Sequence, residues 1–169
     1  MKKLMSIVLS LSVAGLMTAC GGGDDGPAPT GATVGSNAQL VSFAGTYMGC
    51  FAGGTTSEKE TLVFTQQTAD TFSVASSSNK YAAAGCAGAV TGTSNETGTA
   101  SFTGTKTIGA ETVNKFTFTK AGSTPSKQVA LIKGSNPVTL TFGKGANDGG
   151  AVDSEGYPTT FENSSFTKQ

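Results

Sequence analysis

The chain of 169 residues contains no His, no Trp and no Arg. Without His it cannot build a Ser-His-Asp or Cys-His catalytic unit, and it lacks the commonest ligand of zinc and copper. Without Arg it cannot make bidentate guanidinium contacts to phosphate or carboxylate groups. Without Trp, any aromatic platform for a sugar has to come from Tyr or Phe. We therefore expect no catalytic residues, no cofactor and no enzymatic activity.

The N-terminus has the organisation of a secretory signal peptide. Lys2 and Lys3 give it a positive start, and residues 4–17 are apolar apart from a few Ser and small residues. This run is shorter than the roughly 20 apolar residues that a membrane-spanning helix needs. We therefore interpret residues 1–19 as a leader that is removed on export.

The leader ends in the sequence LMTAC at positions 16–20, which places small residues directly before Cys20. This sequence resembles the lipobox of bacterial lipoproteins. The resemblance implies that the leader is cut before Cys20 and that acylated Cys20 anchors the chain in a membrane. Gly21 stands where Asp is associated with inner-membrane retention, so the resemblance implies the outer membrane of a bacterial envelope. The alternative is an ordinary signal peptide followed by an unmodified Cys20.

Residues 20–39 are rich in Gly, Pro, Ala and Asp and contain almost no apolar anchor. Such a segment cannot bury enough surface to offset its ordering entropy, so we expect a flexible tether that leads into a β-rich domain over residues 40–169. Once the leader is removed, nine Lys remain against eleven acidic residues, a net charge of −2. This weakly acidic composition is a poor match for nucleic acid, and we expect no such partner.

From residue 40 onwards the dominant pattern is an alternation with a period of two residues, interrupted by Gly, Asn, Ser and Pro. Phe72 and Val74, for example, alternate with Thr71 and Ser73. This pattern is typical of short antiparallel strands joined by turns. It predicts an all-β domain, an antiparallel meander of about 8–10 short strands forming a single barrel or sandwich. Turn signals place the candidate strands at 45–52, 58–66, 70–76, 79–84, 86–93, 97–108, 111–120, 127–133, 137–143 and 158–168.

The alternation breaks at two places. Val113 has the wrong parity for Phe116, and Phe161 lies five residues before Phe166. At both places we expect a β-bulge or a strand that starts late.

Cys50 and Cys86 are the two cysteines that remain in the exported domain if Cys20 carries lipid. Because the envelope is oxidising, we predict a disulfide between them. Closing a loop of about 36 residues contributes roughly 4 kcal/mol in the loop-entropy model. The alternative is a redox-active or metal-bound pair, but neither Cys lies in a Cys-x-x-Cys motif.

The sequence Gly45-Thr46-Tyr47 follows apolar Leu40 and Phe43 and opens the first predicted strand. It resembles the Gly-x-Trp motif that begins lipocalins and similar ligand-binding barrels, with Tyr in place of Trp. In that family the aromatic ring plugs the closed end of the barrel and packs under an Arg from a late strand. This chain has no Arg, so the sequence offers no counterpart of that basic residue. The alternative is a Tyr that packs at the end of an unrelated barrel or sandwich.

The Gly-rich segment 143–157 concentrates oxygen-bearing side chains, and we considered Asp148, Asp153 and Glu155 as Ca²⁺ ligands. Their spacing does not match an EF-hand loop. We therefore expect a solvated loop and no metal site, with these three residues as the alternative.

Taken together, these features predict a non-catalytic, lipid-anchored envelope protein that binds a small apolar ligand or another envelope protein. Tyr47, Tyr81 and Tyr157 are the amphipathic contact candidates. One alternative is an inhibitor of a secreted hydrolase such as lysozyme, and another is an enzyme that works without His. A large apolar cavity favours the ligand carrier, a protruding ordered loop favours the inhibitor, and a buried Lys or carboxylate in a cleft favours the enzyme.

Overall fold

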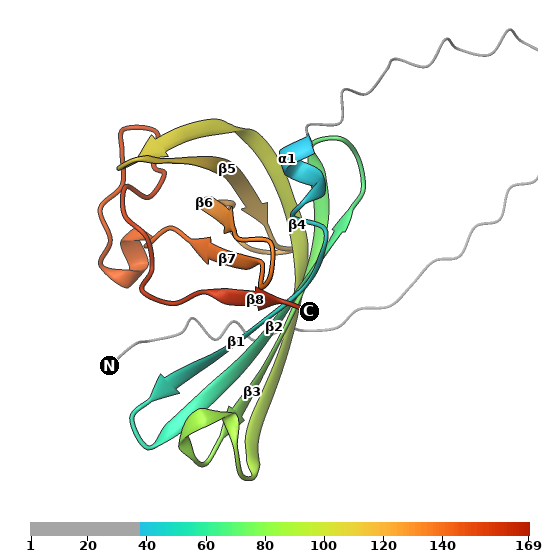
Figure 1. The fold of residues 1–169 in the computed structure, drawn as a ribbon, viewed down its shortest axis with the longest axis vertical. Coiled ribbons are helices and arrows are strands. Elements are labelled where there is room, and N and C mark those ends of the chain that lie inside the picture. Colours follow the sequence, from blue (N-terminus) through green and yellow to red (C-terminus); the bar gives the residue numbers. More distant parts are fainter. Residues whose placement is uncertain (1–37) are drawn as a thin grey trace, which may run out of the picture. The chain divides into compact units, whose positions relative to one another are not determined.

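The computed structural model describes residues 38–169, which form a closed antiparallel β-barrel (Figure 1). The strands follow one another around the barrel in chain order, and the last strand pairs with the first. The all-β meander predicted from the alternation is thereby confirmed, and it closes as a barrel. The strands are β1 (Gly45–Gly53), β2 (Thr56–Gln66), β3 (Thr71–Tyr81), β4 (Val90–Ile108), β5 (Glu111–Thr119), β6 (Ser126–Lys133), β7 (Thr139–Phe142) and β8 (Phe166–Lys168).

Within residues 38–169, three short helices accompany the strands: α1 (Ala38–Val41), η1 (Ala84–Cys86) and η2 (Ala146–Asp148). Ala38 and Gln39, which we assigned to the tether, belong to α1. The rest of the tether, the leader and Cys20 lie outside the described residues. None of the helices between Ala38 and Gln169 combines the length and the apolar character needed to cross a membrane.

Strand boundaries were the weakest part of the sequence prediction. The predicted strands 70–76 and 79–84 are one strand, β3, and the predicted strands 86–93 and 97–108 merge into β4 with its 19 residues. Ser, Asn and Gly at 76–79 and 92–98 resemble turn signals, but in the fold they are paired along their length with neighbouring strands. Cross-strand hydrogen bonding therefore overrides local turn preference here.

The two parity breaks have different causes. The strand predicted at 158–168 begins only at Phe166, so the late start expected there is confirmed. Val113 needs neither a bulge nor a late start, because it faces outward from β5 and packs with Val129 and Tyr157 beneath the segment that precedes β8. The bulge lies instead in the neighbouring strand β4, between Phe102 and Gly104.

Aromatic rings fill the interior of the barrel. All phenylalanines except Phe161 join one chain of ring contacts that also includes Tyr47. Phe116 lies at its centre, with its ring centroid 5.1 Å from Phe43 and 6.3 Å from Phe72. Most pairs are T-shaped, the geometry that aromatic quadrupoles favour. Dense packing of large rings explains how a domain rich in Gly, Ser and Thr secures a core.

One end of the barrel is closed by α1 and the residues that follow it. Leu40, Phe43 and Tyr47 are at most 1% exposed. The Tyr47 hydroxyl donates a hydrogen bond of 2.9 Å to the carbonyl of Ser42, and Lys168 lies over the Tyr47 ring with Nζ 5.5 Å from the centroid. A Cβ on Gly45, whose φ is +134°, would stand 2.7 Å from Lys168 Cε. Gly at position 45 therefore makes room for the side chain that covers the plug.

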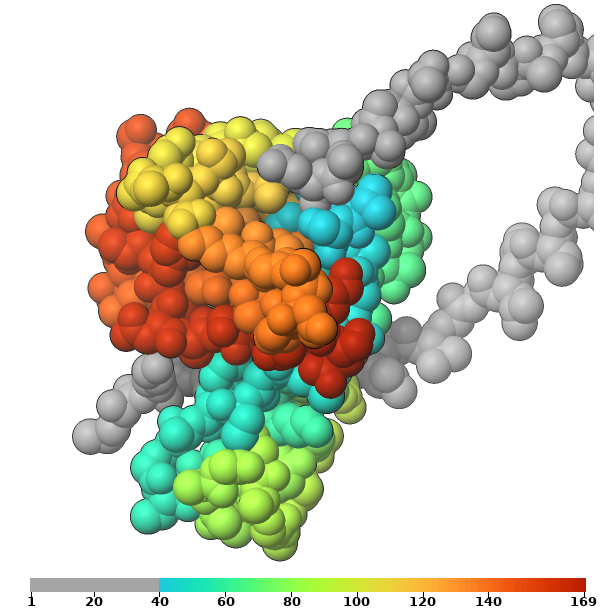
Figure 2. All heavy atoms as spheres, in the orientation of Figure 1, coloured from blue at the N-terminus to red at the C-terminus, as the bar shows by residue number. Residues whose placement is uncertain are grey.

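Strands β1 to β4 continue well beyond the barrel. β4 pairs with β3 from Val90 onwards but meets β5 only from Thr99, and β1 meets β8 only at Tyr47 and Met48. Residues 49–53, 56–61, 75–81 and 90–98 thus form a four-stranded sheet outside the barrel, which we call the extension. Figure 2 shows the end of the extension standing clear of the barrel.

Candidate functional site

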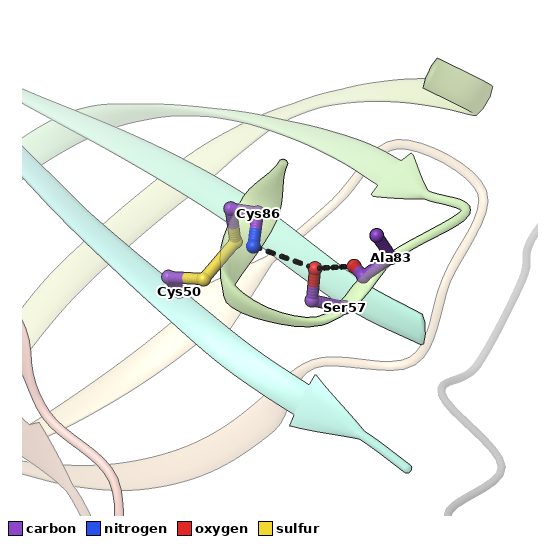
Figure 3. The surroundings of a disulfide bond; sticks show 4 residues. All are labelled: Cys50, Ser57, Ala83 and Cys86. Carbon is purple, nitrogen blue, oxygen red and sulfur yellow. Dashed lines mark hydrogen bonds between the residues drawn. A yellow bond between two sulfur atoms is a disulfide. The ribbon is translucent and has the colours of Figure 1, made fainter. Parts of the chain in front are cut away.

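The end of the extension is held by the disulfide that the sequence predicts. Cys50 on β1 and Cys86 in η1 are bonded, with their Cα atoms 6.0 Å apart. The bond ties the connection between β3 and β4 down onto the first strand of the extension (Figure 3). We call the two turns at this end, residues 53–56 and 82–89, the tip.

A buried serine adds a second attachment. Ser57 on β2 is only 4% exposed, and its hydroxyl donates a hydrogen bond of 2.6 Å to the carbonyl of Ala83. The same oxygen accepts a bond of 2.7 Å from the N–H of Cys86 (Figure 3). Ser57 was not identified from the sequence, because one Ser among many in an alternating strand carries no signal of its own. The disulfide and Ser57 together attach the turn at residues 82–89 to β1 and β2.

The tip exposes small apolar side chains and main chain. Its exposed residues include Ala82, Ala83, Ala84, Ala87 and Ala89, and Val90 at the start of β4 is 52% exposed. Gly85, Cys86 and Gly88 have positive φ values of 72°, 56° and 83°. Small side chains on a constrained loop lose little conformational entropy on binding, which favours such a loop as a contact surface.

Carboxylates gather on one face of the extension. Glu58 and Glu60 lie on the face of β2 that also carries Leu62 and Phe64, so they continue the inner wall of the barrel, and Glu96 on β4 shares this face. Both β2 residues are half-buried, and β2 lies between β1 and β3. Their strand is therefore interior to the extension. We call this side of the extension the inner face.

The charges on the inner face are only partly balanced. The Lys120 ammonium lies 2.6 Å from a Glu96 carboxylate oxygen, and the Ser78 hydroxyl donates to Glu58. Burial, followed by repulsion from Glu58 and Glu96, raises the pKa of Glu60 to about 7. An additional positive charge nearby would stabilise the ionised form of this carboxyl group.

Where the inner face meets the barrel, the aromatic chain is less deeply buried. Phe51, Phe118 and Phe142 are partly buried and pack against the core cluster. Phe51 on β1 has its ring centroid 5.1 Å from that of Phe166. The inner face thus combines acidic and apolar groups, a composition suited to a cationic amphipathic partner.

The three tyrosines singled out from the sequence are not brought together. Tyr47 is fully buried in the plug, and Tyr157 is 3% exposed with its hydroxyl 2.7 Å from Thr103 Oγ1. Tyr81 is half-buried at the end of β3, where it pairs with Ser57 and Val90. Of the three, only Tyr81 lies in the extension.

Two of the three candidate Ca²⁺ ligands, Asp153 and Glu155, are paired with lysines. Asp153 forms an ion pair with Lys106, and this hydrogen bond is the main reason why the pKa of Asp153 is lowered. Glu155 lies 2.8 Å from the Lys115 ammonium and raises the pKa of Lys115 through that bond. Residues 38–169 contain no group of three His, Cys, Asp or Glu that could hold a metal ion. Asp153 and Glu155 instead fasten the segment before β8 to the barrel.

Comparison of the chain with protein-family models, with curated proteins and with solved structures finds no match.

Proposed function

We propose that this chain is a non-catalytic, lipid-anchored envelope protein that binds another protein of the envelope through its extension. The observation that carries the proposal is the constrained tip at the end of a four-stranded sheet that projects from the barrel. Closing the barrel does not require these residues, since β5 and β8 pair with β4 and β1 outside this region. A projecting, ordered and exposed loop supports protein recognition.

The barrel interior gives less support to a small apolar ligand. Phe43, Phe72 and Phe116 are at most 1% exposed, and their rings are in mutual contact. Ligand-carrying barrels keep a cavity in the space that these rings occupy. A partner protein is therefore the better supported of the two ligand classes expected from the sequence.

Site-specific photo-crosslinking in cells tests the proposal. A photoreactive amino acid at Ala87, just before β4, should give a discrete protein adduct. The same group at exposed Thr112, next to the turn that follows the far end of β4, should not. The adduct should disappear in the Cys50→Ser/Cys86→Ser variant. Equal adducts from both positions, or none from Ala87 in correctly exported protein, would contradict the proposal.

Lipid anchoring is tested independently of the partner. The wild-type chain should incorporate a palmitate analogue and sediment with envelopes, and Cys20→Ser should abolish both. Unlabelled wild-type protein that is free in the soluble fraction would contradict the anchor.

The projecting tip also favours the second candidate, a hydrolase inhibitor, because inhibitors commonly present a constrained loop to a cleft. A lytic assay with lysozymes distinguishes it: inhibition that Ala87→Lys removes would make the partner an enzyme. Unaffected lysis across a panel of secreted hydrolases would remove this candidate and leave the binding module.

A further inference from the structure

We propose that the partner adds an extended, basic segment to the open edge of β4 between Val90 and Gly98. This inference rests on the proposed function, because it names the kind of partner that the extension takes. The open edge begins at the tip and ends at the barrel wall, so one bound strand would contact both.

The edge is open over nine residues. β4 is paired with β3 on one side from Val90 to Ser101, whereas on its other side β5 pairs only from Thr99. Within residues 38–169, no strand or turn donates main-chain hydrogen bonds to the second side of 90–98. Unpaired N–H and C=O groups along such an edge are a template for an added strand.

The usual protection of an edge strand is missing here. Residues 90–98 contain no Pro and no Lys, and their single charge, Glu96, is paired with Lys120. The pairing of β4 with β3 shifts register at Thr91, between Val90 and Gly92, and is regular from Gly92 to Gly98. Natural edge strands normally carry such devices against association. The absence of Pro, Lys and a bulge over 92–98 indicates an edge that can accept a further strand.

The opposite edge of the extension is a weaker candidate. On β1 only residues 49–53 lie beyond the pairing with β8, and Cys50 within them is bonded to Cys86. At the other limit, a Cβ on Gly98 would stand 2.7 Å from the Thr119 carbonyl oxygen, so the barrel wall begins there. The open stretch of β4 is longer and bounded at both ends.

The side chains of the edge describe the strand that fits beside it. On the outer face β4 presents Thr91, Thr93, Asn95 and Thr97, which suit Thr-like neighbours. On the inner face Gly92 and Gly98 flank Ser94 and Glu96. The nearest atom to a Cβ on Gly92 would be Lys80 Cδ at 3.9 Å, so a large side chain of an added strand finds room beside Gly92, whereas the Thr119 carbonyl closes this space at Gly98. The complementary segment alternates Thr-like residues with basic and large apolar ones.

Charge selects a basic segment over a second copy of this chain. The inner face carries three carboxylates, Glu58, Glu60 and Glu96, against two lysines. Lys80 lies opposite Glu58 and Gly92, and Lys120 pairs with Glu96. A Lys or Arg entering beside β4 approaches this excess of carboxylates. Burial, followed by repulsion from Glu58 and Glu96, raises the pKa of Glu60 to about 7. A positive charge entering beside these carboxylates would relieve the repulsion, which again favours a basic segment. Two copies joined edge to edge would bring two acidic faces together.

The test uses the full chain and two synthetic nine-residue peptides. In the basic peptide, Thr alternates with Lys and Phe, and in the acidic peptide Glu replaces Lys. We expect the basic peptide to bind at least about ten-fold more tightly and to slow hydrogen exchange at residues 90–98. Glu96→Lys should reverse the preference, whereas Glu111→Lys, which alters an exposed carboxylate at the start of β5, should not.

Two proline variants separate edge pairing from folding. In an antiparallel strand, adjacent N–H groups point to opposite sides, so of Thr93→Pro and Ser94→Pro one removes a donor from the open edge and the other breaks the ladder to β3. The variant that keeps the wild-type melting temperature should lose peptide binding. Binding retained by that variant, or no charge preference, overturns strand addition.

The crosslink from Ala87 distinguishes failure of this inference from failure of the proposed function. A persisting Ala87 adduct with no peptide protection at 90–98 overturns strand addition alone. If the folded proline variant instead abolishes a concentration-dependent dimer of the chain, the occupant is a second copy, and the inference of a basic partner segment is wrong.

Discussion

Lys168, the penultimate residue, lies across the ring of Tyr47 at the start of the first strand. Its ammonium nitrogen is 5.5 Å from the ring centroid and donates a hydrogen bond of 2.9 Å to the carbonyl of Ser42, which also accepts from the Tyr47 hydroxyl. The sequence motif at 45–47 suggested an aromatic plug without its basic partner, since Arg is absent. In the structure a lysine from the last strand takes that place, because its long aliphatic stem reaches over Gly45.

Replacing Lys168 should therefore loosen the closure of the barrel. Lys168→Met removes a cation–π contact and a hydrogen bond, and should lower the free energy of unfolding by about 1–2 kcal/mol in urea melts. Lys133→Met is the matched control, because Lys133 is exposed and pairs only with Glu111 at the surface. Equal losses in the two variants would contradict a specific role for Lys168.

The phenol of Tyr47 should remain neutral in the folded protein at unusually high pH. Burial raises the pKa of Tyr47 to about 12. Between pH 10 and 12 the folded chain therefore binds more protons than the unfolded chain, and stability falls as the pH rises through this window. An ultraviolet titration should show one late phenol that disappears in Tyr47→Phe. Identical titration curves for the two proteins would contradict the assignment.

Ser57 should contribute to stability far more than a typical serine of this domain. Ser57→Ala leaves the Ala83 carbonyl and the Cys86 N–H without their partner, at a cost of about 2 kcal/mol. Exposed Ser94→Ala should cost less than about 0.5 kcal/mol. Hydrogen exchange should also quicken across residues 82–89 in Ser57→Ala only. Removing the disulfide by replacing both cysteines should cost more, roughly 4 kcal/mol.

Asp153 should hold the segment before β8 against the barrel. Its carboxylate pairs with Lys106 and accepts hydrogen bonds from the N–H groups of Glu155 and Tyr157. Asp153→Ala should speed hydrogen exchange over residues 150–160, whereas Asp148→Ala in the same segment should not. Because the pKa of Asp153 is lowered from 3.8, its stabilisation is present above that pH and is lost as the pH falls below it. Acidification below pH 4 should reproduce the effect of the substitution.

Glu60 should make the folded protein less stable at pH 7 and above than at pH 4. The folded protein retains the Glu60 proton up to about pH 7, whereas in the unfolded chain the group ionises near 4.5. Stability therefore falls as the pH rises from 4.5 to 7, and the cost at pH 8 reaches about 3 kcal/mol at 1.36 kcal/mol per pKa unit. Glu60→Gln should raise the melting temperature at pH 8 and change it little at pH 4. Asp70→Asn, which removes one negative charge from an exposed site, is the control.

The alternation of Phe72 and Val74 with small polar residues was enough to predict an antiparallel barrel or sandwich, because burying one face of a sheet imposes a period of two. Cys50 and Cys86 were predictable by elimination. The length of β4 was not: its Thr, Ser, Asn and Gly favour turns locally, and only pairing with β3 makes them a strand. Val113 was misread for a related reason, since the segment that buries its outward face lies far along the chain.

The amino-acid sequence by itself determined the class of fold, the single crosslink and the exclusion of His-based chemistry, since these depend on residue types and on local periodicity. The tertiary structure decided that β1 to β4 run past the barrel, that Ser57 and the disulfide hold their tip, and that Glu58, Glu60 and Glu96 share one face. Strand register and barrel closure set these relationships between distant residues, and a one-residue slip in register would move every one of those side chains to the opposite face.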